Sequence, residues 1–324
     1  MIKDIAFING VVKSREKHLI SRETFVRMAD SADAGEAFSM LVERGFGGEG
    51  FADASPSDYE KIIAAEWNGY KAFLSDYAPS AKFSECIFSR DDFFNAECAV
   101  RQKALGLSDE IYSTEGRFSV DVLKNAASGN YGILPEYLAE PMKNASALFE
   151  NGEAYGAKIS EIFMTAYYKF MLSSVGGGVW KENVVFEIDV KNVSVAIRSG
   201  DAKRAAEHYI AGGRLDRKTL ALIAVGDEKK ALSSLLKTPY YDLVRIGFEE
   251  RKGGSLPTFE KAADDLPMKK LKERRFETEG IVPSLLYAYY KINEIKNVRL
   301  VLAMKLAGAD KEDIKARLKE CYER

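Results

Sequence analysis

Residues 283–302, PSLLYAYYKINEIKNVRLVL, decide the fold class of this chain of 324 residues. Apolar side chains recur every three or four positions in this segment, at Leu285, Tyr289, Ile292, Ile295, Val298 and Leu302. This spacing places them on one face of a helix, and Pro283 suits a first helical turn because its fixed φ matches the helix. The period-two alternation of half-buried strands is not sustained elsewhere in the sequence. We therefore predict an all-α protein with a long helix after Pro283.

The same segment contains one copy of an internal repeat. Arginine follows asparagine six positions later at Asn293/Arg299, and the spacing recurs at Asn9/Arg15, Asn95/Arg101 and Asn192/Arg198. The offsets between successive copies are 86, 97 and 101 residues. Because the chain has 11 asparagines and 18 arginines, chance would give roughly 0.6 such pairs, and four therefore indicate a repeat.

A second shared segment follows each copy: SRETFVRMA from Ser21, SVDVLKNAA from Ser119, DRKTLALIA from Asp216 and DKEDIKARL from Asp310. Each begins with a serine or aspartate, whose side-chain oxygen can cap the free amides of a starting helix. Apolar residues four, seven and eight positions later share one helical face. Arg317 interrupts that face in the last copy, so we expect this helix to be more exposed or to pack against something different.

Glycine-rich breaks separate the predicted helices. They lie at residues 45–48, 176–178, 212–213 and 253–254, where glycine permits the left-handed backbone that ends helices. The breaks and the repeat offsets predict three similar helical units, residues 1–90, 91–187 and 188–324. The repeat has four copies but the chain has only three predicted units, so two copies must share a unit. We expect these to be the first and the last, with the first and last helices packed together.

Composition and charge exclude several classes of protein. Hydrophobic residues make up 46% and charged residues 30%, which is typical of a globular protein. The formal charge of −2 gives no overall attraction to nucleic acid or anionic lipid, so protein partners are expected. Cys86, Cys98 and Cys321 match no disulfide or metal pattern, which favours a reducing cytosol. No charge-free apolar run reaches the roughly 18 residues of a membrane span, so we expect no direct transmembrane insertion.

Residue types that carry chemistry are sparse. His18 and His208 are the only histidines, and neither has a cysteine or carboxylate at a metal-ligand spacing. The sequence has no phosphate loop and no dinucleotide-binding glycine motif. We therefore predict no catalytic residue, no cofactor and no metal. A basic cluster could form either a docking face or a solvated helix face; it comprises Lys269, Lys270, Lys272, Arg274 and Arg275.

The repeated asparagines and arginines are the candidate functional residues. Asparagine and arginine six positions apart lie about 120° from each other around a helix, so both cannot face the same neighbour. Two interpretations follow: they fix equivalent helix contacts within each unit, or they line a shared concave surface that faces a partner. The eight residues are Asn9, Arg15, Asn95, Arg101, Asn192, Arg198, Asn293 and Arg299.

Several repeat segments, taken in order, resemble the C subunit of V-type and archaeal-type ATP synthases, which is related to the d subunit of the eukaryotic V-ATPase. Each segment is a weak motif, and the specificity comes from their order, spacing and repetition over nearly the whole chain. The segments are KSREKHLISRETFVRMADS (13–31), DDFFNAECAVRQKALG (91–106), EIDVKNVSVAIRSGD (187–201), YYKINEIKNVRLVLAMKLAG (289–308) and DIKARL (313–318).

The resemblance implies three similar helical domains in a pseudo-threefold funnel and a non-catalytic role in the central rotor. Such a protein couples the central shaft to the membrane rotor ring, for ATP-driven or ATP-forming transport of protons or sodium ions. The implied partners are the D and F subunits of the central shaft and the membrane rotor ring of proteolipid subunits, with no nucleic acid. The implied location is cytoplasmic, peripheral to the membrane through the complex.

Two other functions remain open from the sequence. A helical-repeat scaffold unrelated to rotary ATPases would bind a protein on a concave surface, although tetratricopeptide and HEAT-like arrays repeat every 34 to 47 residues or so, a shorter period than the offsets found here. An enzyme with an unrecognised site would have to rely on scattered carboxylates.

Overall fold

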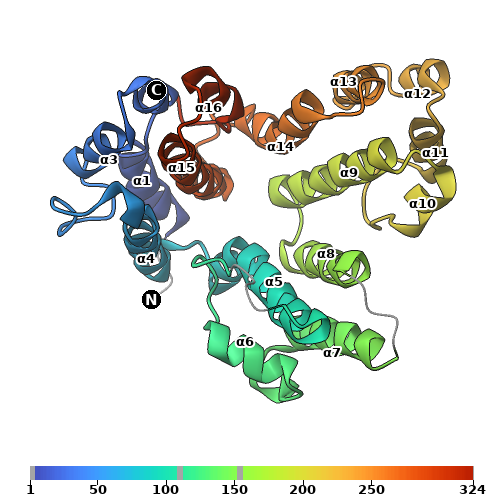
Figure 1. Cartoon of the computed structure of the whole chain (residues 1–324), viewed down its shortest axis with the longest axis horizontal. Helices are drawn as coiled ribbons and strands as arrows, with labels where there is room; N and C mark the ends of the chain where they lie inside the picture. The colour runs from blue at the N-terminus through green and yellow to red at the C-terminus, as the bar shows by residue number, and fades with distance from the viewer. Residues whose placement is uncertain (1–3, 108–111, 152–155, 324) are drawn as a thin grey trace. The chain divides into compact units, whose positions relative to one another are not determined.

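The computed structural model describes residues 4–107, 112–151 and 156–323. These residues form 16 α-helices and two short 3-10 helices, and they contain no β-strand, which confirms the predicted all-α class (Figure 1). The chain divides into two compact units. Unit 1 comprises residues 1–81 and 260–324, and unit 2 comprises residues 82–259. None of the helices in the described part of the chain has the length and apolar character needed to cross a membrane.

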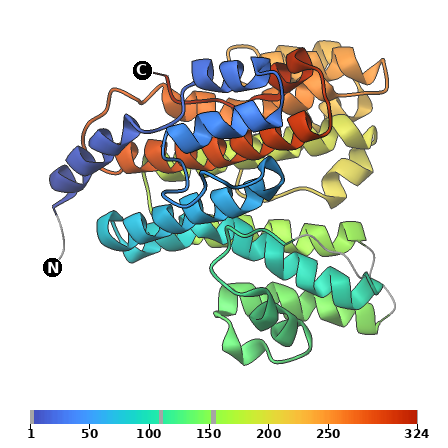
Figure 2. The same cartoon turned by 60° about the vertical axis from the view of Figure 1, so that its left-hand side comes forward.

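Unit 1 is built around its longest helix, α15, which contacts α1, α2, α3, α4 and α16. Figure 2 shows α15 and α16, in red, running alongside the blue helices of residues 5–43. Burial extends almost all round α15, because neighbours cover several of its faces. The helices are α1 (Ile5–Glu16), α2 (Arg22–Asp30), α3 (Ala34–Glu43), α4 (Tyr59–Tyr77), α14 (Pro257–Lys272), α15 (Val282–Leu306) and α16 (Lys311–Arg317), with a 3-10 turn, η1, at Pro56–Asp58.

Unit 2 contains two long helices, α5 and α9, each followed by shorter helices that pack in sequence order. Helix α9 contacts α8, α10, α11 and α13, and α7 pairs with α6 and α8. The helices are α5 (Ala81–Leu105), α6 (Val120–Ala127), α7 (Glu136–Glu150), α8 (Gly156–Ser174), α9 (Val179–Ser199), α10 (Ala202–Glu207), α11 (Arg217–Val225), α12 (Glu228–Ser234) and α13 (Tyr241–Arg251), with a 3-10 turn, η2, at Tyr131–Ile133.

The predicted helix starts are confirmed. Ser21, Ser119, Asp216 and Asp310 are the N-caps of α2, α6, α11 and α16, and each side chain accepts a hydrogen bond from a backbone amide two or three residues ahead. The apolar face behind each cap is buried, as the spacing predicted. In the last copy that face is reduced to Ile314 in α16 and Leu318 directly after it, which are both 0% exposed. The four glycine-rich breaks all lie between helices.

Candidate functional site

The long helix α9 holds the backbone that leads into α11 through two buried side chains. Asn192 Nδ2 donates to the carbonyl oxygen of Ile210 at 2.9 Å, and Asn192 Oδ1 accepts from the Ile210 amide at 2.9 Å. One turn earlier, Asp189 Oδ1 accepts the amides of Arg214 and Leu215 at 2.8 and 2.9 Å. The residue after Leu215 is the N-cap of α11. We call such a pair, an acidic residue and an asparagine three positions later, an acid–Asn anchor.

Helix α5 carries the same anchor at the same spacing. Asn95 exchanges two hydrogen bonds with the backbone of Ser113, at 2.8 and 2.7 Å, and Asp92 accepts the Arg117 amide at 2.6 Å. The Arg117 side chain adds a bond from Nε to Asp92 at 2.7 Å. In both anchors the partners lie 18 residues after the asparagine and 25 after the aspartate. Ser119, the N-cap of α6, follows two residues later.

Unit 1 has a third anchor on α15, but its two partners come from distant parts of the sequence. Asn297 Oδ1 accepts the Lys319 amide at 2.8 Å, and Asn297 Nδ2 donates to the Lys319 carbonyl at 3.3 Å. Glu294 accepts the Ile20 amide at 2.6 Å. Ile20 directly precedes Ser21, the N-cap of α2. The third anchor therefore also holds the entrance to a capped helix, with partners 22 and 274 residues away.

At two positions of the anchored segments, close packing against an anchor side chain leaves room only for glycine. A Cβ on Gly213 would lie 2.2 Å from Asp189 Oδ1, and one on Gly116 would lie 2.8 Å from Asn95 Nδ2. Both distances are well below ordinary contact, so any larger residue would push the anchor side chain out of place. The two glycines are 97 residues apart, as are Asn95 and Asn192.

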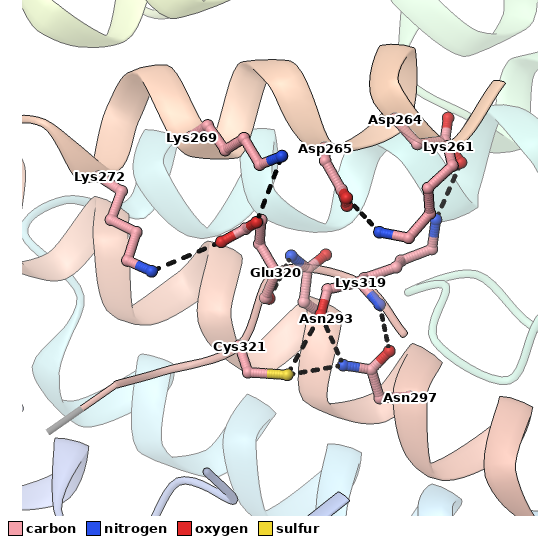
Figure 3. Close-up of polar contacts among 10 residues, drawn as sticks. All are labelled: Lys261, Asp264, Asp265, Lys269, Lys272, Asn293, Asn297, Lys319, Glu320 and Cys321. Atoms are coloured by element: carbon pink, nitrogen blue, oxygen red, sulfur yellow. Dashed lines mark hydrogen bonds and ion pairs between the residues drawn. The ribbon is translucent and has the colours of Figure 1, made fainter. Parts of the chain in front are cut away.

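Residues 318–323 form an extended segment that the helices of unit 1 hold on several sides (Figure 3). Asn293 Nδ2 donates to the Glu320 carbonyl at 2.9 Å. Lys272 lies 3.4 Å from the Glu320 carboxylate and 2.8 Å from that of Glu323, while Lys319 pairs with Asp264 at 2.9 Å. The Lys272 side chain is only 15% exposed. For this member of the basic cluster, the interpretation as a solvated helix face is therefore wrong.

A buried ionic cluster lies beside the third anchor. Lys291, 6% exposed, contacts Glu66 at 2.6 Å and also pairs with Glu294. Glu66 accepts the Gly47 amide at 2.8 Å. Burial works against the charge of Lys291, but the carboxylates of Glu294 and Glu66 outweigh it and raise the pKa of the ammonium group above its ordinary value. Burial raises the pKa of Glu294. For Glu66, burial is outweighed by Lys291 and the Gly47 amide, so the pKa is lowered.

The other predicted residues make dissimilar contacts. Asn9 donates to the carbonyls of Thr278 and Gly280 at 3.0 and 3.1 Å, unlike Asn95 and Asn192. The arginine contacts differ as well: Arg15 lies over the Phe73 ring at 4.6 Å, Arg101 lies 3.6 Å from Glu97, Arg299 pairs with Glu60 at 2.7 Å, and Arg198 is exposed near the end of α9. The structure thus brings two of the four asparagines into equivalent contacts.

Sequence reasoning missed Asp92, Asp189, Glu294 and Asn297. The signal for the first two was the acidic residue three positions before each of Asn95 and Asn192, at the same offset of 97 residues. Asn297 could not be recognised as an anchor residue from the sequence, because the Asn-x5-Arg spacing aligns Asn293, and not Asn297, with the asparagines of the earlier copies. Only the folded chain shows that Asn297 makes the paired backbone bonds.

In the part of the chain that the structure describes, unit 2 has one further polar contact and one groove that are candidates for a reaction centre, and neither has the residues of one. His208 Nδ1 lies 2.9 Å from the carboxylate of Glu161 at the surface. Glu161 also borders a groove of about 430 Å³ between α7 and α8, together with Pro141, Leu148 and Ile162. Across the described ranges, no group of three or more histidine, cysteine, aspartate or glutamate residues is arranged to hold a metal ion.

The fold and its anchors define a class: an all-helical protein whose buried polar residues fix one helix to the entrance of the next. The chain belongs to the ATP synthase (C/AC39) subunit family, whose model matches residues 8–317. This family is a non-catalytic component of the rotary ATPases. The chain is 23% identical to the C subunit of the V-type sodium ATPase of Enterococcus hirae over 98% of both chains. It is 27% identical to the C subunit of the A-type ATP synthase of Pyrococcus furiosus over 45% of this chain and 43% of the relative.

Proposed function

We propose that this protein is the central-rotor component that couples the shaft of a V/A-type ATPase to its membrane rotor ring. The observation that carries the proposal is the match to the Enterococcus hirae relative over 98% of both chains, within a family model that covers residues 8–317. Its partners would be the D and F subunits of the shaft and the ring of proteolipid subunits. The protein would then act on the cytoplasmic side, peripheral to the membrane, in ATP-driven or ATP-forming transport of protons or sodium ions.

The anchors support a body of three similar modules, headed by α5, α9 and α15. The predicted boundaries at residues 90 and 187 would fall inside α5 and α9, so we place the module starts at Ala81 and Val179. The third module would combine α15 and α16 with α1 to α4, in agreement with the composition of unit 1. We propose that the three modules surround a pseudo-threefold axis as a funnel.

A coupling protein has to transmit torque without being sheared, and the anchors suit that demand. The anchors on α5 and α9 each tie a long helix to the segment before another helix by at least three hydrogen bonds, and the anchor on α15 holds Ile20, before α2, by one bond and Lys319 by two. Fully bonded buried polar networks rigidify a core and favour a single arrangement. Since the net charge is only −2, local complementary patches would select the partners.

Co-expression with the shaft and ring proteins of the same organism tests this function. With an affinity tag on a shaft protein, we expect purification to capture this chain and the ring stoichiometrically. Omitting this chain should leave the shaft without the ring. The variant Asp242→Ala, which changes a residue with an 80% exposed side chain, is the matched control and should be captured as well as the wild type. A folded chain that binds neither shaft nor ring would contradict the proposal and favour the scaffold alternative.

A further inference from the structure

The three anchors differ greatly in the length of chain that each one closes. In unit 2 the anchor hydrogen bonds join residues 18 to 26 positions apart. In unit 1 the bond from the Ile20 amide to Glu294 spans 274 positions. The entropy cost of closing a loop grows with the logarithm of its length. The Ile20–Glu294 bond of unit 1 therefore carries a larger closure cost than the anchor bonds of unit 2.

Residues 318–323, which we call the strap, complete the third anchor. An isolated parallel bridge joins Tyr322 to Ser21, so the strap lies beside the entrance to α2. Leu318 and Cys321 are 0% and 4% exposed, and the Tyr322 ring packs edge-on against Tyr290 at 5.5 Å. Burial raises the pKa of Cys321 to about 12, so its thiol stays protonated and donates to the Lys319 carbonyl at 3.1 Å. The strap is thus packed into unit 1, and its Leu318 and Cys321 are part of the core.

The contacts of the strap reach three different segments of unit 1. Asn297 and Asn293 on α15 bond to its backbone. Lys272 on α14 pairs with its carboxylates, and Ser21 at the start of α2 joins it by the bridge. Removing the strap would strip partners from all three at once. The packing of unit 1 is therefore incomplete without the strap.

We propose that the strap is a closing device, and that unit 1 completes its folding only when the strap docks, after unit 2 has folded. A folded unit 2 replaces residues 82–259 of flexible chain by a compact body, which shortens the loop between Ile20 and Glu294. While unit 2 is unfolded, the three-halves power law makes closure over the 274 positions between Ile20 and Glu294 about 36-fold less probable than closure over the 25 positions of a unit 2 anchor. Long-range contacts of this kind form late in folding.

Pulse-labelled hydrogen exchange during refolding of the full chain tests the order of events. We expect amides of α6 and α11 to become protected first, and those of Ile20, α2 and Lys319 to become protected together and later. The variant Asp189→Asn, which weakens a unit 2 anchor, should slow protection in both units. Protection of α2 before α11, or an Asp189→Asn effect confined to unit 2, would overturn the proposal.

A variant that lacks residues 318–324 tests the strap itself. We expect α2 and α3 to lose most of their protection while α6 and α11 keep theirs, and the peptide LKECYER added in trans to restore it. A scrambled peptide of the same composition is the control. If the shortened chain does not fold at all, the refolding order of the full chain still decides the question. Unchanged protection of α2 in the shortened chain would contradict the closing role.

Discussion

Replacing Asp189 by alanine is expected to lower the free energy of unfolding of unit 2 by about 3–5 kcal/mol. The side chain is 0% exposed and accepts two backbone amides, those of Arg214 and Leu215. It also accepts the Tyr240 hydroxyl at 2.7 Å, and burial together with this bond raises the pKa of Tyr240. Alanine would remove the acceptor of all three donors, and the Tyr240 hydroxyl would be left unsatisfied in a buried site, where such a loss costs about 1–3 kcal/mol.

The two tryptophans give a separate signal for each unit in this experiment. Trp67 lies in α4 of unit 1 and Trp180 in α9 of unit 2, and both are buried. Urea unfolding of Asp189→Ala in a Trp67→Phe background therefore reports unit 2 alone. Asp242→Ala, at a surface position of the same unit, is the matched control and should change stability by less than about 1 kcal/mol. A similar loss from both substitutions would contradict the account of the anchor.

Replacing Lys291 by methionine should destabilise unit 1 by about 3–5 kcal/mol near neutral pH. Methionine has a similar length but no charge, so the buried Glu294 and the partly buried Glu66, whose side chain is 22% exposed, would lose their shared cation. Two carboxylates in one buried site repel each other, and the folded state would bind a proton more tightly than the unfolded state does. The pKa of the pair in the folded variant is thus raised, and stability is lost as pH rises through it.

The raised pKa of the carboxylate pair in Lys291→Met gives a pH test for the ionic cluster. Between about pH 7.5 and pH 5.5 the stability of Lys291→Met should increase, because protonation relieves the buried repulsion. Urea unfolding at each pH, monitored by the fluorescence of Trp67 in a Trp180→Phe background, measures the stability of unit 1. Lys270→Met is the control, since Lys270 is half exposed and pairs with Glu273 at the surface. A Lys291→Met variant whose stability falls in parallel with the wild type on acidification would refute the role of the cluster.

The fold class and the helix starts could be predicted because they depend on local patterns. The stripe from Leu285 to Leu302 and the capping residues Ser21, Ser119 and Asp216 act within a few residues, so the sequence shows them directly. The anchors at Asn95 and Asn192 were found in part, since their repeat offset is regular.

The third anchor could not be predicted because it depends on tertiary pairing. Nothing local links Glu294 to Ile20, 274 residues away, or shows that Asn297 and not Asn293 pairs with Lys319 by two bonds. The acidic residues of the anchors were missed for a related reason. Taken by itself in the sequence, Asp189 has no feature that distinguishes it from other helix residues, and only the folded chain places three hydrogen-bond donors around it.

The anchors connect these local details to the proposed coupling role. A rotor component that lacks catalytic chemistry contributes through shape and stiffness, and both depend on how firmly each helix is fixed to the next. Because every anchor holds the entrance of a capped helix on a long helix, weakening one should loosen its own module first. A variant with one weakened module would then bind less well to the partner that this module contacts.

Hydrogen exchange of three variants, Asn95→Ala, Asn192→Ala and Asn297→Ala, tests most directly whether equivalent anchors hold three alike modules. We expect each substitution to speed exchange chiefly in one helix: α6 for Asn95, α11 for Asn192 and, through the strap that Asn297 holds beside Ser21, α2 for Asn297. If the three substitutions gave the same diffuse increase, or if any one left its helix as protected as in the wild type, the anchors would not be what fixes these helices.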